Sequence, residues 1–310
     1  MKPSCPDDAR AISLEQAILE TLAYSDVFDF PLHAEELHRY LRVRSTLADL
    51  QGALARGVGS VACCKGFYFL NGREALVPLR MQRDACSRPA LLRALHFGRI
   101  LGRLPFIRMV ALTGSLALLN ADETADLDYM LVARQGRVWT ARGFALLFGR
   151  LTARRGYTLC PNLIVSARLL AWPQRDLYTA REICQMIPIT GLGVYDRLRQ
   201  VNDWTDEYLP NASGMPPLAE SAPKPTSRVQ SVQEWALQGA LGDRVEAWEM
   251  DRKIRRFERQ AGFGAETHFD ADTCQGNFHH HGAHTRQALQ ERLVKLGIES
   301  ALAPTSSHSL

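Results

Sequence analysis

The sequence lacks the features of an exported or membrane-spanning protein. Its seven cysteines form an odd set without a Cys-x-x-Cys pair, and Cys63 and Cys64 are adjacent, so we expect no disulfide framework. The longest apolar runs, 109–119 and 143–149, are shorter than the ~20 residues that a membrane helix needs. The first residues reach acid before any apolar run, unlike a signal peptide. We therefore expect a protein of the reducing cytoplasm that contacts no membrane.

Negative charge is scarce in the middle of the chain. From residue 85 to residue 175 there are thirteen arginines, no lysine and only four acids. The four acids lie within seven residues: Asp122, Glu123, Asp126 and Asp128. Arginine favours bidentate contacts with phosphate, and clustered carboxylates favour divalent cations. Arginines at helical spacing are often only a solvated face, but that does not explain why the acids gather at one place.

The acids belong to the segment "LTGSLALLNADETADLDYMLV", residues 112–132. Asp126 and Asp128 flank Leu127 at the start of an apolar run that is typical of a strand. Residues two apart on a strand point to the same face, so both carboxylates project together. Burying two such charges is costly unless they are paired or bind a metal. The pattern therefore predicts a compensating cation.

Residues 13 to 71 predict three short helices and a β-hairpin. The first helix follows a capping box at Ser13. The second, over 34–41, follows Pro31, and the third follows a second capping pattern at Thr46. Two short apolar runs around Lys65-Gly66 predict the hairpin. Three helices and a hairpin resemble a winged helix.

The third of these helices is poor in positive charge. Its only cation is Arg56, and Asp49 opposes it. Binding of a DNA duplex requires several phosphate contacts from lysine or arginine. DNA is therefore a possible but not a favoured partner, and a packing or dimerisation module is preferred.

Residues 88 to 187 alternate helix and strand, which indicates an α+β domain with a small mixed sheet. The predicted helices are 90–101, a single turn at 116–119, 138–153 and 177–186, and the predicted strands are 107–112, 127–133 and 157–165. Beyond them, 211–227 is rich in proline, serine and alanine, which favours a linker or surface loop. Ser231 has capping-box spacing and predicts one long helix to about Gln260, and the chain from 303 is polar.

Gly114-Ser115, ten intervening residues and Asp126-Leu127-Asp128 before an apolar run resemble the signature of the DNA polymerase β-type nucleotidyltransferase superfamily. The resemblance covers about 88–187. The winged-helix-like front and helical back resemble uncharacterised bacterial members. It implies four parts: a winged-helix-like domain (1–85), a nucleotidyltransferase-like domain (86–210), a linker or surface loop (211–227) and a helical C-terminal region with a polar tail (228–310).

The resemblance implies transfer of a nucleoside monophosphate from a nucleoside triphosphate, such as ATP, with release of pyrophosphate. The acceptor is unknown and is a protein, a nucleic acid or a small molecule. Asp126 and Asp128 are the expected catalytic residues and ligands of Mg²⁺ or Mn²⁺. Gly114 lets the backbone approach the ligand, and N–H groups at Ser115 can hold phosphate oxygens. The other nucleotide-binding residues that we predict are Asn162, Arg134 and Arg137.

The family commonly adds a third carboxylate on a later strand, and this sequence departs from that pattern. The matching strand, "YTLCPNLIVS" at 157–166, contains no acid. Asn162 stands at the expected position, and a neutral amide cannot act as a base. Either two carboxylates suffice, or Asp176 or Glu182 supplies the third, or the site binds nucleotide without turnover.

Two other functions are compatible with these motifs. An Asp-x-Asp motif also binds nucleotide-sugar diphosphates in metal-dependent glycosyltransferases, but the Gly-Ser turn before it argues against that class. A non-catalytic regulator would sense nucleotide with a degraded site, or would bind DNA through the winged helix. DNA binding without nucleotide consumption would favour the regulator.

Two further segments carry weaker signals. Cys274 and the histidines of 279–284 suggest zinc, but Gly282 interrupts them and no second cysteine is near, so a polar loop is preferred. The run "DRKIRRFER", 251–259, has five cations against two acids. Contact with nucleic acid is one interpretation of this run, and a solvated helix face is the commoner one.

Overall fold

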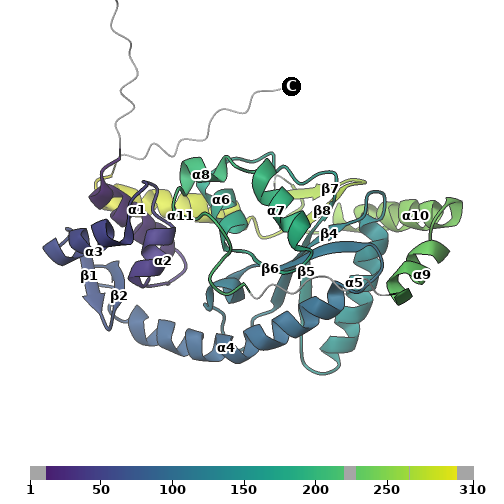
Figure 1. Ribbon diagram of the computed structural model, residues 1–310, viewed down its shortest axis with the longest axis horizontal. Helices are drawn as coiled ribbons and strands as arrows, with labels where there is room; N and C mark the ends of the chain where they lie inside the picture. The colour runs from purple at the N-terminus through teal and green to yellow at the C-terminus, as the bar shows by residue number, and fades with distance from the viewer. Residues whose placement is uncertain (1–11, 220–227, 265, 299–310) are drawn as a thin grey trace, which may run out of the picture. The chain divides into compact units, whose positions relative to one another are not determined.

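The computed structural model describes residues 12–219, 228–264 and 266–298 (Figure 1). Contacts divide the chain into two compact units that interleave in sequence. Unit 1 comprises residues up to 78, residues 206–213 and the chain from 287 onward. Unit 2 comprises 79–205 and 214–286. Neither unit is a continuous segment, whereas the sequence pattern predicts consecutive parts.

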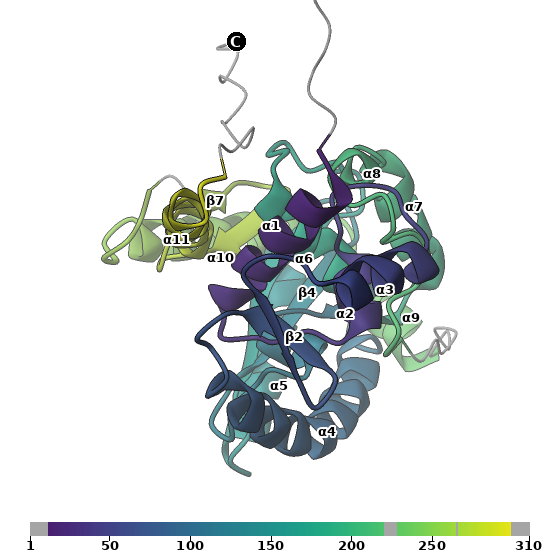
Figure 2. The same cartoon turned by 90° about the vertical axis from the view of Figure 1, so that its left-hand side faces the viewer.

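Unit 1 contains the three predicted helices and the predicted hairpin, followed by segments from later in the chain (Figure 2). Its elements are α1 (Leu14–Asp26), α2 (Ala34–Arg39), α3 (Leu47–Arg56), β1 (Val61–Cys64), β2 (Phe67–Leu70), most of α8 (Thr205–Tyr208) and the greater part of α11 (His281–Lys295).

The predicted helix starts in unit 1 are confirmed at the level of single hydrogen bonds. Ser13 accepts a hydrogen bond from the N–H of Gln16 at 3.1 Å, and Thr46 and Asp49 cap each other reciprocally. Leu22, Leu37 and Leu50 then bury the inner faces of the three helices. Local capping and helical periodicity are therefore sufficient to define these elements.

Unit 2 contains the remaining helices and a six-stranded sheet. Its elements are α4 (Leu76–Leu101, from residue 79), β3 (Ile107–Leu112), the 3₁₀ turn η1 (Ser115–Leu118), β4 (Leu127–Ala133), α5 (Val138–Ala153), β5 (Leu159–Ser166), α6 (Leu177–Gln185), β6 (Ile187–Thr190), α7 (Leu192–Val201), α9 (Arg228–Ala236), α10 (Ala240–Phe257), β7 (Thr267–Phe269) and β8 (Thr273–Gly276).

The sheet is mixed, with the strand order β6-β3-β4-β5-β8-β7. Only β4 and β5 are parallel, and α5 connects them as a crossover helix. Helices α4 and α5 cover one face, where the Tyr129 hydroxyl donates to the carbonyl of Ala94 at 2.8 Å. Helices α6 and α7 lie on the other face (Figure 1). An α+β fold with a mixed sheet is confirmed.

Three predicted elements agree with the structure over their full lengths: the strands 107–112 and 127–133 and the helix 138–153. The third predicted strand lies two residues later at its start, and the helix from Leu177 ends at Gln185. Helix α4 begins at Leu76 rather than at 90. Pro89 lies inside this helix, although a proline lacks an N–H and usually interrupts a helix.

The single long helix predicted from Ser231 to about Gln260 is wrong. The structure has two helices, α9 and α10, separated at residues 237–239. Gly239 has φ 78° and ψ −165°, a positive-φ conformation that a helix cannot contain. The C-terminal region also contributes the hairpin β7–β8 to the sheet, so it is not purely helical.

Residues 211–219 of the predicted linker form an irregular segment without helix or strand. The rest of that linker, 220–227, and the predicted polar tail from 303 lie outside the described residues. Within the described chain, no helix combines the length and the apolarity that crossing a membrane demands.

Candidate functional site: a glycine turn facing two carboxylates

The antiparallel pairing of β3 with β4 brings the Gly-Ser turn to the two aspartates. Leu112, the last residue of β3, pairs with Tyr129. One step further, the N–H of Thr113 donates to the carbonyl of Asp128 at 2.9 Å. Gly114 and Ser115 therefore lie beside the start of β4, although twelve residues separate Gly114 from Asp126 in the chain. The structure brings the two halves of the predicted motif together.

Gly114 occupies a position that requires glycine for two reasons. Its φ of 69° and ψ of −162° lie in a region that only glycine adopts readily. A Cβ on residue 114 would lie 2.5 Å from Oδ2 of Asp128, well inside van der Waals contact. The glycine therefore leaves the space that the Asp128 carboxylate occupies.

Asp128 is half-buried, and Asp126 beside it is exposed. Burial, followed by the negative charge of Asp126, raises the pKa of Asp128 to about 6. Hydrogen bonds from Cys160 and Asn162 act in the opposite direction and lower this pKa. The folded chain thus holds two mutually repelling carboxylates, as the sequence predicts, and hydrogen bonds offset only part of that repulsion.

Asn162 contacts the carboxylate pair of Asp126 and Asp128, called the diacid below, through Asp128. Its side-chain amide donates to Oδ1 of Asp128 at 2.9 Å, and its own Oδ1 accepts from the Cys160 thiol at 3.1 Å. Burial raises the pKa of Cys160 to about 12, so the thiol keeps its proton and acts as the donor. The register of β5 against β4 shifts by one residue at Asn162, a bulge that re-aims its side chain.

Of the two acids that the sequence offered as a third carboxylate, Glu182 is the one whose pKa responds to the charge of Asp128. Strand β6 starts at Ile187, which pairs with Leu112, so α6 ends at the same end of the sheet as the aspartates. Burial, and then the charge of Asp128, raise the pKa of Glu182 to about 7, while a hydrogen bond from Gln185 lowers it. The sequence indicated Glu182 only as one of two options, because nothing local shows which face of α6 it occupies.

Asp176 has a structural role instead. It is the N-cap of α6, where its Oδ1 accepts from the N–H of Thr179 at 2.7 Å. Its Oδ2 accepts from Gln174 at 2.7 Å and pairs with Arg286 at 3.0 Å. Both oxygens are therefore engaged, so Asp176 is a poor candidate for the missing acid.

Helix α4 supports the loop between the glycine turn and the diacid. Arg80, which is 3% exposed, donates to the carbonyl of Leu119 at 3.1 Å. The Ser87 hydroxyl donates to the carbonyl of Ala121 at 3.2 Å and accepts from its N–H at 3.1 Å. This support was not predicted from the sequence. Arg80, Arg83 and Ser87 have the i, i+3, i+7 spacing of one helix face, which is the signal that could have found it.

The structure does not bring the predicted arginines to the diacid. Arg134 and Arg137 follow the last residue of β4, whereas Asp128 lies near its first residue. A strand rises ~3.3 Å per residue, which places Arg134 about 20 Å along the chain from Asp128. Arg137 pairs with Asp243 at 2.8 Å. Arg142 lies against the rings of Trp139 and Phe257 at 6.0 and 5.1 Å, on the α5 face of the sheet.

No group of three or more His, Cys, Asp or Glu side chains within the described residues could hold a metal ion. A diacid alone is nevertheless a common Mg²⁺ site, because Mg²⁺ usually binds one or two carboxylates together with substrate phosphates. The Cys274 side chain is buried in β8, while His281 and His284 are exposed at the start of α11. The structure therefore does not gather the cysteine and histidines of 274–284.

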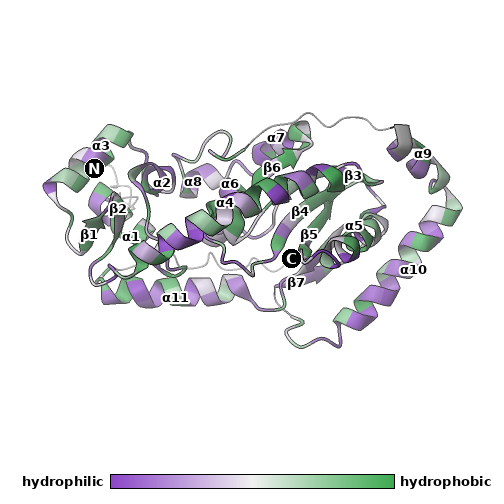
Figure 3. Cartoon of the chain, turned by 90° about the horizontal axis from the view of Figure 1, so that it is seen from below, coloured by the Kyte–Doolittle hydropathy of each residue, from purple (hydrophilic) through white to green (hydrophobic). Residues whose placement is uncertain are grey.

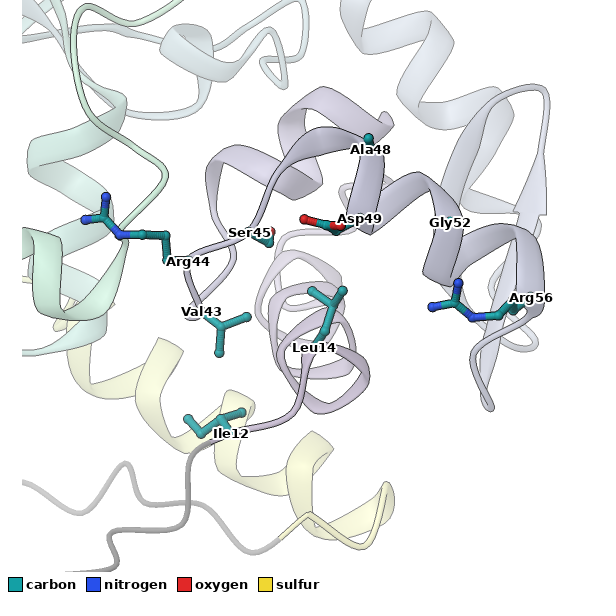
Figure 4. A pocket seen from close by; sticks show the side chains of 9 residues that line it. All are labelled: Ile12, Leu14, Val43, Arg44, Ser45, Ala48, Asp49, Gly52 and Arg56. Atoms are coloured by element: carbon teal, nitrogen blue, oxygen red, sulfur yellow. The ribbon is translucent and has the colours of Figure 1, made fainter.

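Two depressions lie elsewhere on the surface, one in each unit. The first, of about 530 Å³, lies in unit 1 between the α1 and α3 ends (Figure 4). Arg44 and Arg56 line it, but its carboxylate, Asp49, is occupied in capping α3. The second, of about 330 Å³, is lined by residues such as Tyr195 and Arg199. Neither includes the diacid, and neither combines groups with an evident reaction.

Comparison of the chain with models of protein families, with curated proteins and with solved structures gave no match. The function must therefore be inferred from the geometry and chemistry of the site itself.

Proposed function

We propose that the chain is a nucleotidyltransferase that moves a nucleoside monophosphate from a nucleoside triphosphate to an acceptor and releases pyrophosphate. The observation that carries this proposal is the placement of Gly114 against Asp128, with Asp126 alongside. A glycine turn that leaves room for a carboxylate pair matches the motif of the DNA polymerase β-type superfamily. The alternation of helix and strand on either side of the motif also supports this fold.

The residues at this end of the sheet have distinct roles in the proposed reaction. Asp126 and Asp128 provide two anionic oxygen ligands for Mg²⁺ or Mn²⁺, which suits hard cations. A cation held there would supply positive charge that stabilises the negative charge of the phosphates during transfer. Ser115 is the first residue of the turn η1, and its N–H can donate to a phosphate oxygen. Asn162 orients the Asp128 carboxylate by donating to it.

We assign the third acid to Glu182 rather than to strand β5. Its raised pKa of about 7 keeps a fraction of the carboxyl group protonated at neutral pH. The ionised fraction can accept a proton from an acceptor hydroxyl, because a base works best with a pKa near the working pH. Asn162 cannot supply this function, since an amide has no proton affinity near neutral pH.

The front part of unit 1 fits a winged-helix module in this proposal. Three helices precede the hairpin, and the bridge between Leu32 and Tyr68 joins the hairpin to the loop before α2. Arg56 is the only cation on α3, which favours packing or dimerisation over binding of a DNA duplex. The alternative is a nucleotide-sensing or DNA-binding regulator with a degraded site.

The test is transfer of label from each of four [α-³²P]NTPs, with Mg²⁺ and a cell extract, followed by identification of the labelled species. We expect label transfer and pyrophosphate release that Asp126→Asn and Asp128→Asn each abolish. The matched control is Asp122→Asn, because Asp122 lies in the same loop and its carboxylate accepts hydrogen bonds from the backbone and hydroxyl of Thr124. That variant should retain activity.

Three results would count against the proposal. Full transfer by either diacid variant would exclude the catalytic assignment. A large loss of stability in the metal-free diacid variants would mean that the carboxylates are structural. Saturable nucleotide binding without transfer to any acceptor would instead favour the regulator.

A further inference from the structure

Two glutamates of the helices α9 and α10 point inward. Glu234 accepts from the N–H of Phe106 at 2.7 Å and pairs with Arg108 at 2.7 Å. Glu246 accepts from the first N–H groups of α5, those of Trp139 and Thr140, at 2.8 and 2.7 Å. Both glutamates are only 9% exposed. These acids attach the two helices to the body of unit 2 and contribute little negative charge to the surface.

The same helices expose large apolar side chains to the surface. Trp235 on α9 is 75% exposed, and Trp248 on α10 is 61% exposed. Leu241, Val245 and Trp248 follow the i, i+4, i+7 spacing of a single helix face. Contiguous exposed apolar surface commonly marks a binding site. Figure 3 shows apolar and polar segments alternating along α10.

The same helix face continues as a run of arginines. Arg252, Arg255 and Arg256 are exposed. The first of them lies one turn after Trp248, with its guanidinium 5.1 Å from the centre of that ring, and it pairs with Glu249 at 2.6 Å. The exposed acids of α10 are Asp243, which pairs with Arg137, and Asp251. The surface therefore joins exposed indole rings to an excess of positive charge.

We propose that this face of α9 and α10 binds single-stranded nucleic acid. Unstacked bases can lie on Trp235 and Trp248, and the backbone phosphates can pair with Arg255 and Arg256. A duplex keeps its bases stacked on each other and cannot use the indole rings. A second copy of the chain would bring two arginine-rich faces together, which repel. The inference goes beyond nucleotidyl transfer and does not depend on the diacid.

The test measures binding of the full chain to fluorescein-labelled 15-nucleotide strands of RNA and of DNA by fluorescence anisotropy. Three variants are compared. The first is Trp235→Ala/Trp248→Ala, and the second is Arg252→Gln/Arg255→Gln/Arg256→Gln. The third is the charge-matched control Arg150→Gln/Arg154→Gln/Arg155→Gln, which removes three exposed arginines at the end of α5.

We expect the double tryptophan variant to weaken single-strand binding about tenfold or more, because stacking of each base contributes substantially. The α10 arginine variant should lower the slope of log Kd against log salt by about 1.4, since the two lost phosphate contacts, of Arg255 and Arg256, contribute ~0.7 each. The control variant should change both quantities much less. Because all substituted side chains are exposed, circular dichroism melting should not change.

Four outcomes would overturn the proposal. In the first, the two arginine variants lose the same amount of affinity, and in the second, the tryptophan variant binds as tightly as the native chain. In the third, a duplex of the same sequence binds more tightly than the single strand, and in the fourth, no strand binds at low salt. If sedimentation reveals a dimer that the tryptophan substitutions dissociate, the face is a self-association surface. If only anionic vesicles bind, it is a lipid-binding surface. Comparison of the RNA and DNA strands identifies which of the two is preferred.

Discussion

At the candidate site Gly114 lies so close to Asp128 that a side chain on residue 114 would overlap the Asp128 carboxylate. An ideal Cβ on residue 114 would lie 2.5 Å from the Asp128 Oδ2 and 3.3 Å from its Cγ. The backbone of Gly114, at φ 69°, independently disfavours any other residue. The conformation of the Gly114 turn and the position of the Asp128 carboxylate are therefore coupled, because both cannot occupy the same volume.

The substitution Gly114→Ala should destabilise the protein by about 2–4 kcal/mol in urea unfolding, which combines backbone strain with overpacking. Gly136→Ala is the matched control. Gly136 has nearly the same φ, 68°, but no atom lies within 4 Å of the position that an added methyl carbon would take. The control should show only the strain, roughly 1 kcal/mol.

The excess over the control should disappear when Asp128→Ala accompanies Gly114→Ala, because the clashing oxygen is then absent. Additive effects of the two substitutions would mean that the predicted contact does not exist in solution.

The stability of the metal-free protein should fall as the pH rises from about 4 to 7. The folded-state pKa values of Asp128 and Glu182, about 6 and about 7, exceed their ordinary values of 3.8 and 4.5. In this window these two carboxyl groups bind more protons in the folded chain than in the unfolded chain, so their contribution to the free energy of unfolding decreases with pH. Above pH 7 both groups become ionised in both states, and their contribution becomes constant.

Asp128→Asn should remove much of this slope, because it deletes one titrating group and one cause of the raised pKa of Glu182. We expect the variant to gain about 1–2 kcal/mol over the native chain between pH 5 and pH 7.5, after allowance for solvent screening. Urea unfolding at both pH values in EDTA measures the difference. Parallel pH profiles for the two proteins would contradict the electrostatic interpretation.

Asn162→Asp should make the metal-free protein less stable and more responsive to metal with nucleotide present. The substitution replaces a donor to Asp128 with a third carboxylate at 2.9 Å separation or slightly more, which costs roughly 1 kcal/mol or more at neutral pH. Asn162→Ala is the control, since it removes the hydrogen bond without adding charge. Thermal unfolding in EDTA, and with Mg²⁺ or Mn²⁺ plus nucleotide, separates the two effects. If Asn162→Asp behaves like Asn162→Ala in both buffers, the residue does not act on the metal.

Glu182→Gln should reduce nucleotidyl transfer at least tenfold while leaving the melting temperature unchanged or higher, because the variant lacks a base and a repelling charge. Asp176→Ala should do the reverse. It removes the cap on Thr179 and the ion pair with Arg286, which lowers stability by about 1 kcal/mol and leaves transfer intact. Single-turnover rates and urea midpoints for both variants test the assignment. A large loss of activity in Asp176→Ala, with Glu182→Gln still active, would mean that Asp176 and not Glu182 is the base.

Short-range patterns predicted the elements that carry the motif. The strands 107–112 and 127–133 were predicted with their observed limits because apolar runs bounded by turn residues leave little freedom. Thr46 marked the start of α3 for the same local reason, since capping involves neighbours within four residues. The proximity of Gly114 to the diacid was also predictable, because the two strands that carry them are consecutive in the chain and consecutive strands usually pair.

Long-range relationships were not predictable in the same way. The addition of β7–β8 to the edge of β5 joins segments about 110 residues apart in the sequence. The buried caps made by Glu234 and Glu246 belong to the same class, since each joins segments more than 100 residues apart. A local pattern carries no information on which distant backbone groups need a partner.

The sequence by itself determined that two carboxylates share one strand face and that a glycine turn precedes them, because strand periodicity and backbone sterics act over a few residues. Only the tertiary structure decided which other charges reach that face. It brought Glu182 within electrostatic reach of Asp128 and left Arg134 and Arg137 beyond the far end of β4. Charges interact through space, and the distance between them depends on how the strands and helices pack, not on their separation along the chain.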